Sequence, residues 1–302
     1  MSPVHPRSNV QPGSTALYEC TVPAGSTVPA GSTVPLGNTV TPGSTAPPGN
    51  TVTPGSTVTP GNTAPHGRTV PAGDAVDVWW FDTRTVTVGP ADLADLDHGE
   101  RKRAEAFLFP ADRRRYRVAH LMLRRVLAGY TGTTPASLRF GRGRCPRCAA
   151  AGKPVLLPAS GRGARTVPSF SLAHSGAMVL IAVAGRPVGV DVEADAAGCV
   201  CSLALALHPA DAARGAGLGE RERHEAIITC WVRAEAVLKA TGQGIGHGLA
   251  GFPVGTGQAT GLSVNGCTVR EVAAPPGYLA AFALAGAGGV IPHLRAEAPA
   301  TS

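Results

Sequence analysis

Hydrophobic residues recur at two different spacings after residue 75, and the spacing changes from segment to segment. Residues 77–81 are a short aromatic and aliphatic run, which predicts an opening strand. Residues 92–105 are polar and helix-prone. Residues 113–130 place apolar side chains at helical spacing with arginines on the opposite face, and residues 220 to about 241 form a second helical stretch. The first strand is therefore expected to lead into helices.

The remaining segments favour strands and turns. Residues 170–193 are expected to hold a strand or short helix and then a hairpin, whose arms 179–184 and 188–193 are joined by Gly185-Arg186-Pro187. Residues 141–165 are rich in glycine and arginine and are expected to be a loop. Further strands are expected at residues 262–264, 268–272 and 278–284. A strand-helix-strands pattern that appears twice predicts an α+β protein of two similar halves, residues 75–187 and 188–302.

The first quarter of the 302-residue chain has a different pattern, a six-residue repeat from Val22 to Val76 such as V-P-A-G-S-T. Aliphatic residues hold one phase of this repeat, as a left-handed β-helix requires. Nearly every repeat also carries a proline, which removes a ladder donor. We therefore expect residues 1–74 to be a disordered low-complexity extension, with the β-helix as a weaker alternative.

Composition and charge narrow the class of protein. Residues 1–74 hold only four charges, which cancel, so the net charge of +7 belongs to residues 75–302. The chain has no run of 18 apolar residues for a membrane span and no apolar segment near its first residue typical of a secretory signal. Seven unevenly spaced cysteines do not resemble a disulfide framework, so a reduced, cytoplasmic setting is expected.

Two carboxylates provide the first candidate chemistry. In the segment Val188–Glu193, Asp191 and Glu193 share one strand face and the valines share the other. Oxygen ligands at this spacing suit Mg²⁺, which takes one or two protein carboxylates and completes its shell with water and phosphate. An exposed polar strand face is the commoner reason for such alternation, so these two residues alone leave both interpretations open.

Two further groups of residues also allow both a structural and a functional interpretation. Trp231, Glu235 and Lys239 are spaced i, i+4, i+8 and so lie on one helix face, as a surface ion pair would also do. His174 precedes Ser175 just before the expected hairpin, where a histidine is more often a structural hydrogen-bonding group.

Taken together and in order, these segments resemble a known family. Phe170-Ser-Leu-Ala-His174-Ser175-Gly176, Gly189-Val-Asp191-Val-Glu193 and the segment from Trp231 through Glu235 and Lys239 to Gly242 are similar to the motifs of the surfactin-type 4′-phosphopantetheinyl transferases. That family typically shows F-N-x-S-H-S, G-[VI]-D-[VI]-E and W-x-x-K-E-x-x-x-K. Three shorter segments fit the same order: Gly152-Lys153-Pro154, Phe107–Tyr116 and Pro276–Ala281. The resemblance covers about residues 76–286 and none of the repeat.

The resemblance implies a fold of two α/β halves related by a pseudo-two-fold axis, acting as a monomer. It implies transfer of the phosphopantetheine arm of coenzyme A to a serine of an apo acyl or peptidyl carrier protein, with release of 3′,5′-ADP. Asp191, Glu193 and Glu235 would hold Mg²⁺. Glu235 would also act as general base, and Lys239 would stabilise the charge on the leaving phosphate.

The same resemblance assigns the coenzyme A contacts, and a pI near 9.3 agrees with an anionic ligand. The residues expected to bind coenzyme A are Arg115, Lys153, His174 and Ser175, with Arg101 and Arg103 as weaker candidates. No nucleic acid or membrane is expected as a partner, although a basic chain alone would also suit a nucleic-acid binder.

Departures from the motifs leave two rival interpretations. Ala234 stands where the family usually has a lysine beside the helix glutamate, so a carrier-binding scaffold without turnover, or an enzyme that uses Arg233 instead, is conceivable. Ser171 likewise replaces the usual asparagine. The second rival is a zinc-containing nucleic-acid module built on Cys145-x-x-Cys148 with Cys199 and Cys201, although this spacing is not a standard one.

Overall fold

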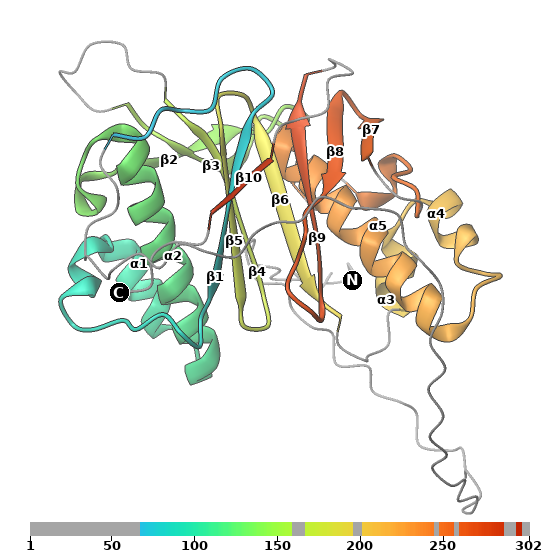
Figure 1. Ribbon diagram of the computed structural model, residues 1–302, viewed down its shortest axis with the longest axis horizontal. Helices are drawn as coiled ribbons and strands as arrows, with labels where there is room; N and C mark the ends of the chain where they lie inside the picture. Colours follow the sequence, from blue (N-terminus) through green and yellow to red (C-terminus); the bar gives the residue numbers. More distant parts are fainter. Residues whose placement is uncertain are drawn as a thin grey trace, which may run out of the picture. The chain divides into compact units, whose positions relative to one another are not determined.

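Two four-stranded sheets pack against each other and carry a long helix on each outer face (Figure 1). The structure is a computed structural model that describes residues 67–158, 167–195, 201–244, 248–256, 260–286 and 294–297. All of these belong to one unit that begins at Pro60. The protein is therefore α+β, as the pattern of segments predicts, and most of the hexapeptide repeat lies outside the described residues.

The first sheet has the order β10-β1-β5-β4 and the second the order β6-β9-β8-β7. Neighbours are antiparallel except β1 and β10, which run parallel. The strands of the first sheet are β1 (Val76–Asp82), β4 (Ser169–Ser175), β5 (Met178–Ala184) and β10 (Leu294–Glu297). Those of the second are β6 (Val188–Ala194), β7 (Thr260–Val264), β8 (Cys267–Glu271) and β9 (Tyr278–Ala285).

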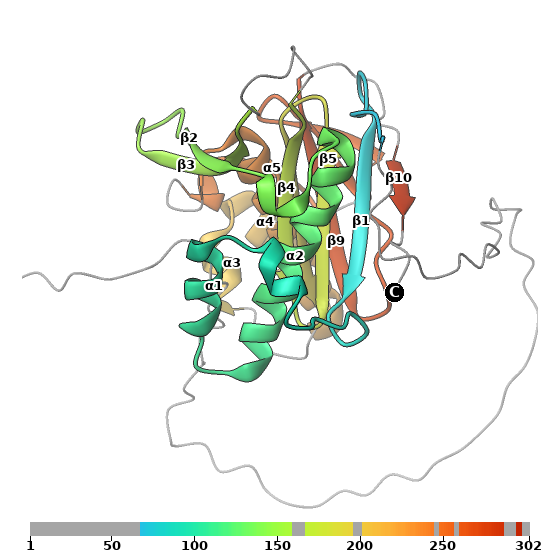
Figure 2. The same ribbon diagram turned by 90° about the vertical axis from the view of Figure 1, so that its left-hand side faces the viewer.

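Helix α2 (Pro110–Thr131) covers the outer face of the first sheet (Figure 2). The strand residues Trp79, Phe81 and Ile181 pack with α2 in one apolar cluster, whereas Val78 and Leu180 pack with the second sheet in another. Because β1 and β5 have residues packed on both faces, β5 is apolar throughout and β1 is apolar from Val78 to Phe81, rather than alternating.

Helix α5 (Glu220–Thr241) covers the second sheet in the same way. Ala281 and Ala283 of β9 face α5, and Phe282 of the same strand lies between the two sheets. The layers are therefore helix, sheet, sheet, helix. Both long helices span 22 residues and end at a left-handed glycine, Gly132 and Gly242, which is the usual residue for that helix terminus.

The shorter helices lie in the connections between these layers. They are α1 (His98–Glu105), α3 (Cys201–Ala206), α4 (Pro209–Arg214) and three 3₁₀ turns, η1 (Asp92–Asp95), η2 (Pro135–Ser137) and η4 (Leu249–Gly251). The segment 92–105 is therefore helical in two pieces, and its second piece begins with a capping box between Asp97 and Glu100. No helix in the part of the chain that the structure describes is long and apolar enough to cross a membrane.

The expected hairpin across Gly185-Arg186-Pro187 is wrong. Strand β5 pairs with β1 and β4, and β6 pairs with β9, so the two arms belong to different sheets. Arg186 holds this crossing by donating its Nε–H to the Ala285 carbonyl at 2.9 Å and by pairing with Asp74. The local hairpin is instead β4–β5, which turns at Gly176 with a φ of 53°.

The expected loop at residues 141–165 is wrong in part. Residues 140–156 form a two-stranded ribbon, β2 (Phe140–Arg144) paired antiparallel with β3 (Ala151–Leu156). Only Leu156 of the eleven strand residues is buried, so the ribbon lacks the alternating apolar positions by which a strand is recognised.

The end of the repeat, from residue 67 onward, contacts the folded unit. The backbone N–H of Arg68 donates to the Gly129 carbonyl at 3.1 Å, and the Arg68 guanidinium lies 4.3 Å from the centre of the Trp79 ring. Val70 packs against the α2 core, and Asp74 pairs with Arg186. Ordered structure therefore begins before the first strand.

The glycine of the G-V-D-V-E segment has a steric role that can be tested. A Cβ on Gly189 would lie less than 3.0 Å from backbone atoms of Ala236 and Ala240 in α5. We expect Gly189→Ala to lower the free energy of unfolding by about 1–3 kcal/mol or more, because β6 and α5 must move apart.

Chemical denaturation of the two proteins measures this difference. Gly217→Ala is the matched control, since a Cβ there meets nothing within 4 Å. Equal stabilities for the two variants would contradict the close packing of β6 on α5.

Candidate active site

Strand β6 and helix α5 bring the candidate acidic residues and Lys239 to one interface. Gly189 permits close contact between the two backbones, and Asp191 follows it by two residues on β6. The Lys239 ammonium donates to Asp191 Oδ1 at 2.6 Å. Asp191 is 5% exposed, whereas the Lys239 side chain keeps 31% of its surface exposed, so the ion pair lies at the edge of the interface. The spacing of Glu235 and Lys239 on one helix face therefore directs both residues toward β6.

Burial raises the pKa values of all three carboxyl groups, and the charge of Asp191 raises those of Glu193 and Glu235 further above the ordinary value. Burial raises the pKa of Glu193 to about 7, and the negative charge of Asp191 adds to the effect. Burial raises the pKa of Glu235 to about 7, with Asp191 and Glu193 again adding and Lys239 opposing. Burial also raises the pKa of Asp191 in spite of Lys239. One ammonium thus offsets only part of the negative charge that the three ionised groups would carry.

Two carboxylate oxygens are buried without a partner. Asp191 Oδ2 and Glu235 Oε1 have no hydrogen-bond partner within the described part of the chain. Buried carboxylate oxygens are ordinarily hydrogen-bonded or bound to a cation. Among the described residues, however, no group of three or more histidine, cysteine, aspartate or glutamate side chains is arranged as a metal site.

Serine side chains on β4 fix the position of β6 relative to β4. Ser171 Oγ accepts the Val190 N–H at 3.0 Å, and Ser169 Oγ accepts the Val188 N–H at 3.3 Å. Ser175 accepts the Ala194 N–H at 3.1 Å and donates to Glu193 Oε2 at 2.7 Å. The serine that replaces the usual asparagine at position 171 is therefore part of the contact between the two sheets. Ser175 is bound to the carboxylate cluster.

Basic side chains lie beside the carboxylates at the end of β4. Burial, together with the charges of Arg115 and Lys239, lowers the pKa of His174 to about 4. His174 Nδ1 is buried without a partner among the described residues. Arg115, on the first turns of α2, pairs with Asp112 at 3.0 Å and keeps its side chain 27% exposed. His174, Arg115 and Lys239 thus share one electrostatic environment.

The other residues expected to bind coenzyme A have contacts outside the group of three carboxylates. The Lys153 ammonium donates to the Val188 carbonyl at 3.2 Å, at the start of β6, and burial lowers the pKa of Lys153 to about 8. Arg101 donates to backbone carbonyls of η1 through Leu93 and Leu96. Arg103 is exposed on α1 and acts electrostatically on Tyr116.

Position 233 does not supply the cation missing at Ala234. The Arg233 guanidinium is buried, donates to the Gly255 carbonyl at 2.5 Å and pairs with Glu271. Ala234 has no exposed surface and packs in the apolar core between α5 and the second sheet. The alternative in which the protein depends on Arg233 instead of the missing lysine gains no support, because the contacts of Arg233 with Gly255 and Glu271 lie on another face of α5.

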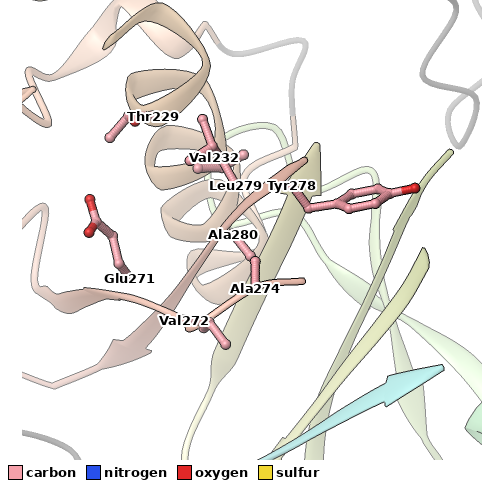
Figure 3. A pocket seen from close by; sticks show the side chains of 8 residues that line it. All are labelled: Thr229, Val232, Glu271, Val272, Ala274, Tyr278, Leu279 and Ala280. Carbon is pink, nitrogen blue, oxygen red and sulfur yellow. The ribbon is translucent and has the colours of Figure 1, made fainter. Parts of the chain in front are cut away.

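A hollow beside α5 lies apart from this cluster. It measures about 140 Å³ and its lining includes Thr229, Val232 and Glu271, but none of the candidate site residues (Figure 3). Tyr278 lines the hollow with its backbone end, while its phenol points away from the other labelled side chains (Figure 3). The Tyr278 hydroxyl accepts the Ala177 N–H at 3.0 Å. Tyr278 thus holds the β4–β5 turn, which follows His174. The sequence of the segment Pro276–Ala281 did not reveal this role.

The zinc interpretation gains no support from the described residues. Cys145 and Cys148 lie in the turn between β2 and β3, where both are free thiols. Cys199 lies outside the described residues, as does the side chain of Cys201.

Comparison with known proteins agrees with the motifs. No family model matches the chain. The 4′-phosphopantetheinyl transferase HetI of Nostoc sp. is 33% identical over 155 residues, 50% of this chain and 62% of that protein. The 4′-phosphopantetheinyl transferase psf-1 of Bacillus pumilus is 30% identical over 156 residues, 51% of this chain and 60% of that protein. A relative from Synechocystis sp. is 32% identical over 163 residues, 53% of this chain and 62% of that protein.

These relatives confirm the resemblance to the 4′-phosphopantetheinyl transferase superfamily. The chain spans about three fifths of the length of the curated relatives it matches.

The raised carboxyl pKa values predict a pH dependence of stability in metal-free protein. Glu193 and Glu235 have pKa values of about 7 in the folded protein against an ordinary 4.5, so between these values the folded chain binds protons that the unfolded chain has released. We expect their contribution to be fully present below about pH 4.5 and to be lost as the pH rises through 7. The free energy of unfolding should fall by about 1–3 kcal/mol per group over this range.

Denaturant titrations of the wild type, Glu193→Gln and Glu235→Gln, each with a chelator, measure this slope. Each glutamine variant should flatten the decline between pH 5 and pH 7.5. His174 contributes a slope of opposite sign below pH 6.5, which cancels when variants are compared with the wild type. Parallel curves for all three proteins would contradict the raised pKa values.

Proposed function

We propose that this protein transfers the 4′-phosphopantetheine group of coenzyme A to a serine of an apo acyl or peptidyl carrier protein, with release of 3′,5′-ADP. The observation that carries the proposal is the buried ion pair of Asp191 with Lys239, flanked by Glu193 and Glu235. These are the positions at which the family motifs have their acidic and basic residues. The names of the curated relatives support the same activity.

The chemistry of the three carboxylates suits Mg²⁺, although among the described residues their side chains are not arranged as a metal site. Asp191, Glu193 and Glu235 supply hard oxygen donors, two of their oxygens are buried without a partner among the described residues, and their raised pKa values reflect uncompensated negative charge. Asp191, Glu193 and Glu235 would hold the ion. When bound, Mg²⁺ supplies charge neutralisation for the pyrophosphate of coenzyme A.

Glu235 suits the role of general base. A carboxylate with a pKa of about 7 can accept the proton of the incoming serine hydroxyl near neutral pH, directly or through water. Lys239 keeps its proton, because neighbouring carboxylates raise its pKa against the effect of burial. Its ammonium would stabilise the negative charge that develops on the leaving phosphate.

The coenzyme A phosphates would bind on the basic side of the cluster. The charges of Arg115 and Lys239 both act on His174, which supports this role for Arg115 and His174. Ser175, Lys153, Arg101 and Arg103 complete the proposed set, although their present contacts are to Glu193 or to the backbone.

The fold proposed for this activity is a pseudo-two-fold pair of α/β halves, residues 75–187 and 188–302, in a cytoplasmic monomer. The equal lengths and identical glycine termini of α2 and α5 support it. A carrier-binding scaffold without turnover is the second candidate, and the observation that favours it is the buried Ala234 in place of a lysine.

Intact-mass analysis of a panel of apo carrier proteins tests the activity. After incubation with coenzyme A and Mg²⁺, the wild type should add one phosphopantetheine group to at least one carrier. Asp191→Asn and Glu235→Gln should each lower the initial rate about 100-fold or more. Glu225→Gln, an exposed residue of the same helix, is the matched control and should transfer at the wild-type rate. Unchanged carrier masses across the panel would favour the scaffold.

Thermal unfolding provides a readout for the metal that does not depend on transfer. Mg²⁺ should raise the melting temperature of the wild type more at pH 8 than at pH 5, since protonated carboxyl groups bind it poorly. Asp191→Asn should lose this shift and Glu225→Gln should keep it. An equal shift in all three proteins would place Mg²⁺ elsewhere.

Arg115 should act on substrate binding more than on the chemical step. Arg115→Ala removes a partly exposed guanidinium next to His174, and we expect it to raise the KM for coenzyme A more than it lowers kcat. Arg221→Ala, on the exposed part of α5, is the control for a lost positive charge. A fall in kcat at unchanged KM would contradict a role for Arg115 in coenzyme A binding.

A further inference from the structure

The turn between β2 and β3 holds two cysteines that the transferase proposal does not use. Residues 145–148 read Cys-Pro-Arg-Cys, and the turn is closed by two backbone hydrogen bonds of 2.8 Å, Cys145 N–H to Ala150 and Ala149 N–H to Cys145. Ala149 has a φ of 58°, an uncommon conformation for a residue other than glycine. The backbone is therefore folded tightly around the first cysteine.

The same turn places Cys148 three residues after Cys145 around one tight bend. The backbone N–H of Cys148 acts first, and the backbone N–H of Arg147 and the Cys148 thiol act with it, to lower the pKa of Cys145. A lowered pKa favours the thiolate, which is the reactive form. By contrast, burial raises the pKa of Cys230 to about 12 and that of Cys267 to about 11.

The turn that carries Cys145 and Cys148 lies beside a hollow at the protein surface. Cys148 is exposed, Cys145 is 5% exposed, and Arg147 between them lines a hollow of about 260 Å³ together with Gln243, Phe252 and Asn265. A guanidinium at the rim suits a ligand that carries carboxylates. Glutathione disulfide is a small disulfide of that kind.

We propose that Cys145 and Cys148 form a reversible dithiol–disulfide site that exchanges with small-molecule disulfides. The Cys145 thiolate attacks one sulfur of the small disulfide, which breaks the sulfur–sulfur bond, forms a mixed disulfide and releases one small thiolate. The Cys148 thiolate then attacks the Cys145 sulfur, forms the intramolecular bond and releases the second small thiolate. The two protons lost by the cysteines are taken up by these thiolates, so the protein is oxidised by two electrons and the small disulfide is reduced.

The exchange is coupled to the end of α5. The Cys145 thiol donates to the Gln243 carbonyl at 3.5 Å, and the Gln243 N–H donates to the Leu238 carbonyl at 3.1 Å beyond the helix end. A disulfide sulfur has no hydrogen to donate, so oxidation removes this contact next to the helix that carries Lys239.

Oxidation of the reduced full-length protein with glutathione disulfide at neutral pH tests the site. Intact mass should fall by two hydrogens, and peptide mapping under non-reducing conditions should join Cys145 to Cys148. Cys148→Ser should instead stop at the mixed disulfide and gain one glutathione at Cys145. Cys230→Ser, a buried cysteine outside the turn, should behave as the wild type.

Three outcomes would overturn the proposal. The first is a wild-type mass that stays unchanged under conditions that oxidise the denatured chain. The second is a disulfide bond mapped to other cysteines, such as Cys199 and Cys201. The third is purified protein whose turn binds zinc and which reacts with glutathione disulfide only after the zinc is chelated. Hydrogen exchange at residues 239–244 should also increase on oxidation in the wild type and not in Cys148→Ser. These measurements are made on this protein itself and not on a carrier protein. Failure of the disulfide proposal is therefore distinguishable from failure of carrier modification.

Discussion

The site depends on the close approach of one strand to one helix at Gly189. Any side chain there would collide with the backbone of α5 near Ala236 and Ala240. Since side chains on β6 alternate, Asp191 then faces α5 from the same side as Gly189, within reach of Lys239. The same proximity buries Asp191 and Glu235 beside the half-buried Glu193, and among the described residues the Lys239 ammonium offsets part of their charge. Removing ionised groups from water without full compensation costs several kcal/mol per ion, so the pKa values of these carboxyl groups are raised. A steric property of one glycine is thereby linked to the electrostatics of the site.

The second constraint is the contact between the two sheets, which sets His174 and Ser175 against Asp191 and Glu193. Strands β4 and β6 belong to different sheets, yet serine hydroxyls of β4 accept three backbone N–H groups of β6. These bonds fix the register of the two strands although no ladder joins them. A serine reaches the neighbouring backbone with a short side chain, which keeps the strands close, and Ser171 is therefore compatible with the fold. Tyr278 adds a contact from β9 to the Ala177 N–H at the turn of the same hairpin.

The two long helices were predictable: α2 places apolar positions at helical spacing opposite its arginines, and α5 is a long stretch without strand or turn signals. The short helices α3 and α4 were not predicted. The strand pairing was not predictable, because β5 and β6 are both apolar and are separated by three residues that resemble a hairpin turn. Their partners, β1 and β9, are distant in sequence, and only the packing of two sheets separates the arms. In the site, periodicity places Asp191 with Glu193, and Glu235 with Lys239, on common faces. That these two faces meet does not follow from local spacing, and it was expected only from the ordered motifs.

The substitution at Ala234 shows how the site is limited to one helix face. Positions 231, 235 and 239 follow one another at nearly whole turns, whereas 234 lies about 100° from 235 and faces the apolar core. A lysine at 234 would bury its alkyl stem among core residues. Alanine instead packs in the apolar core between α5 and the second sheet without placing a cation there. The cations near the acidic residues are then Lys239, which pairs with Asp191, and Arg115, whose charge acts on His174. Because the Lys239 ammonium offsets only part of the charge, the three carboxyl groups keep raised pKa values.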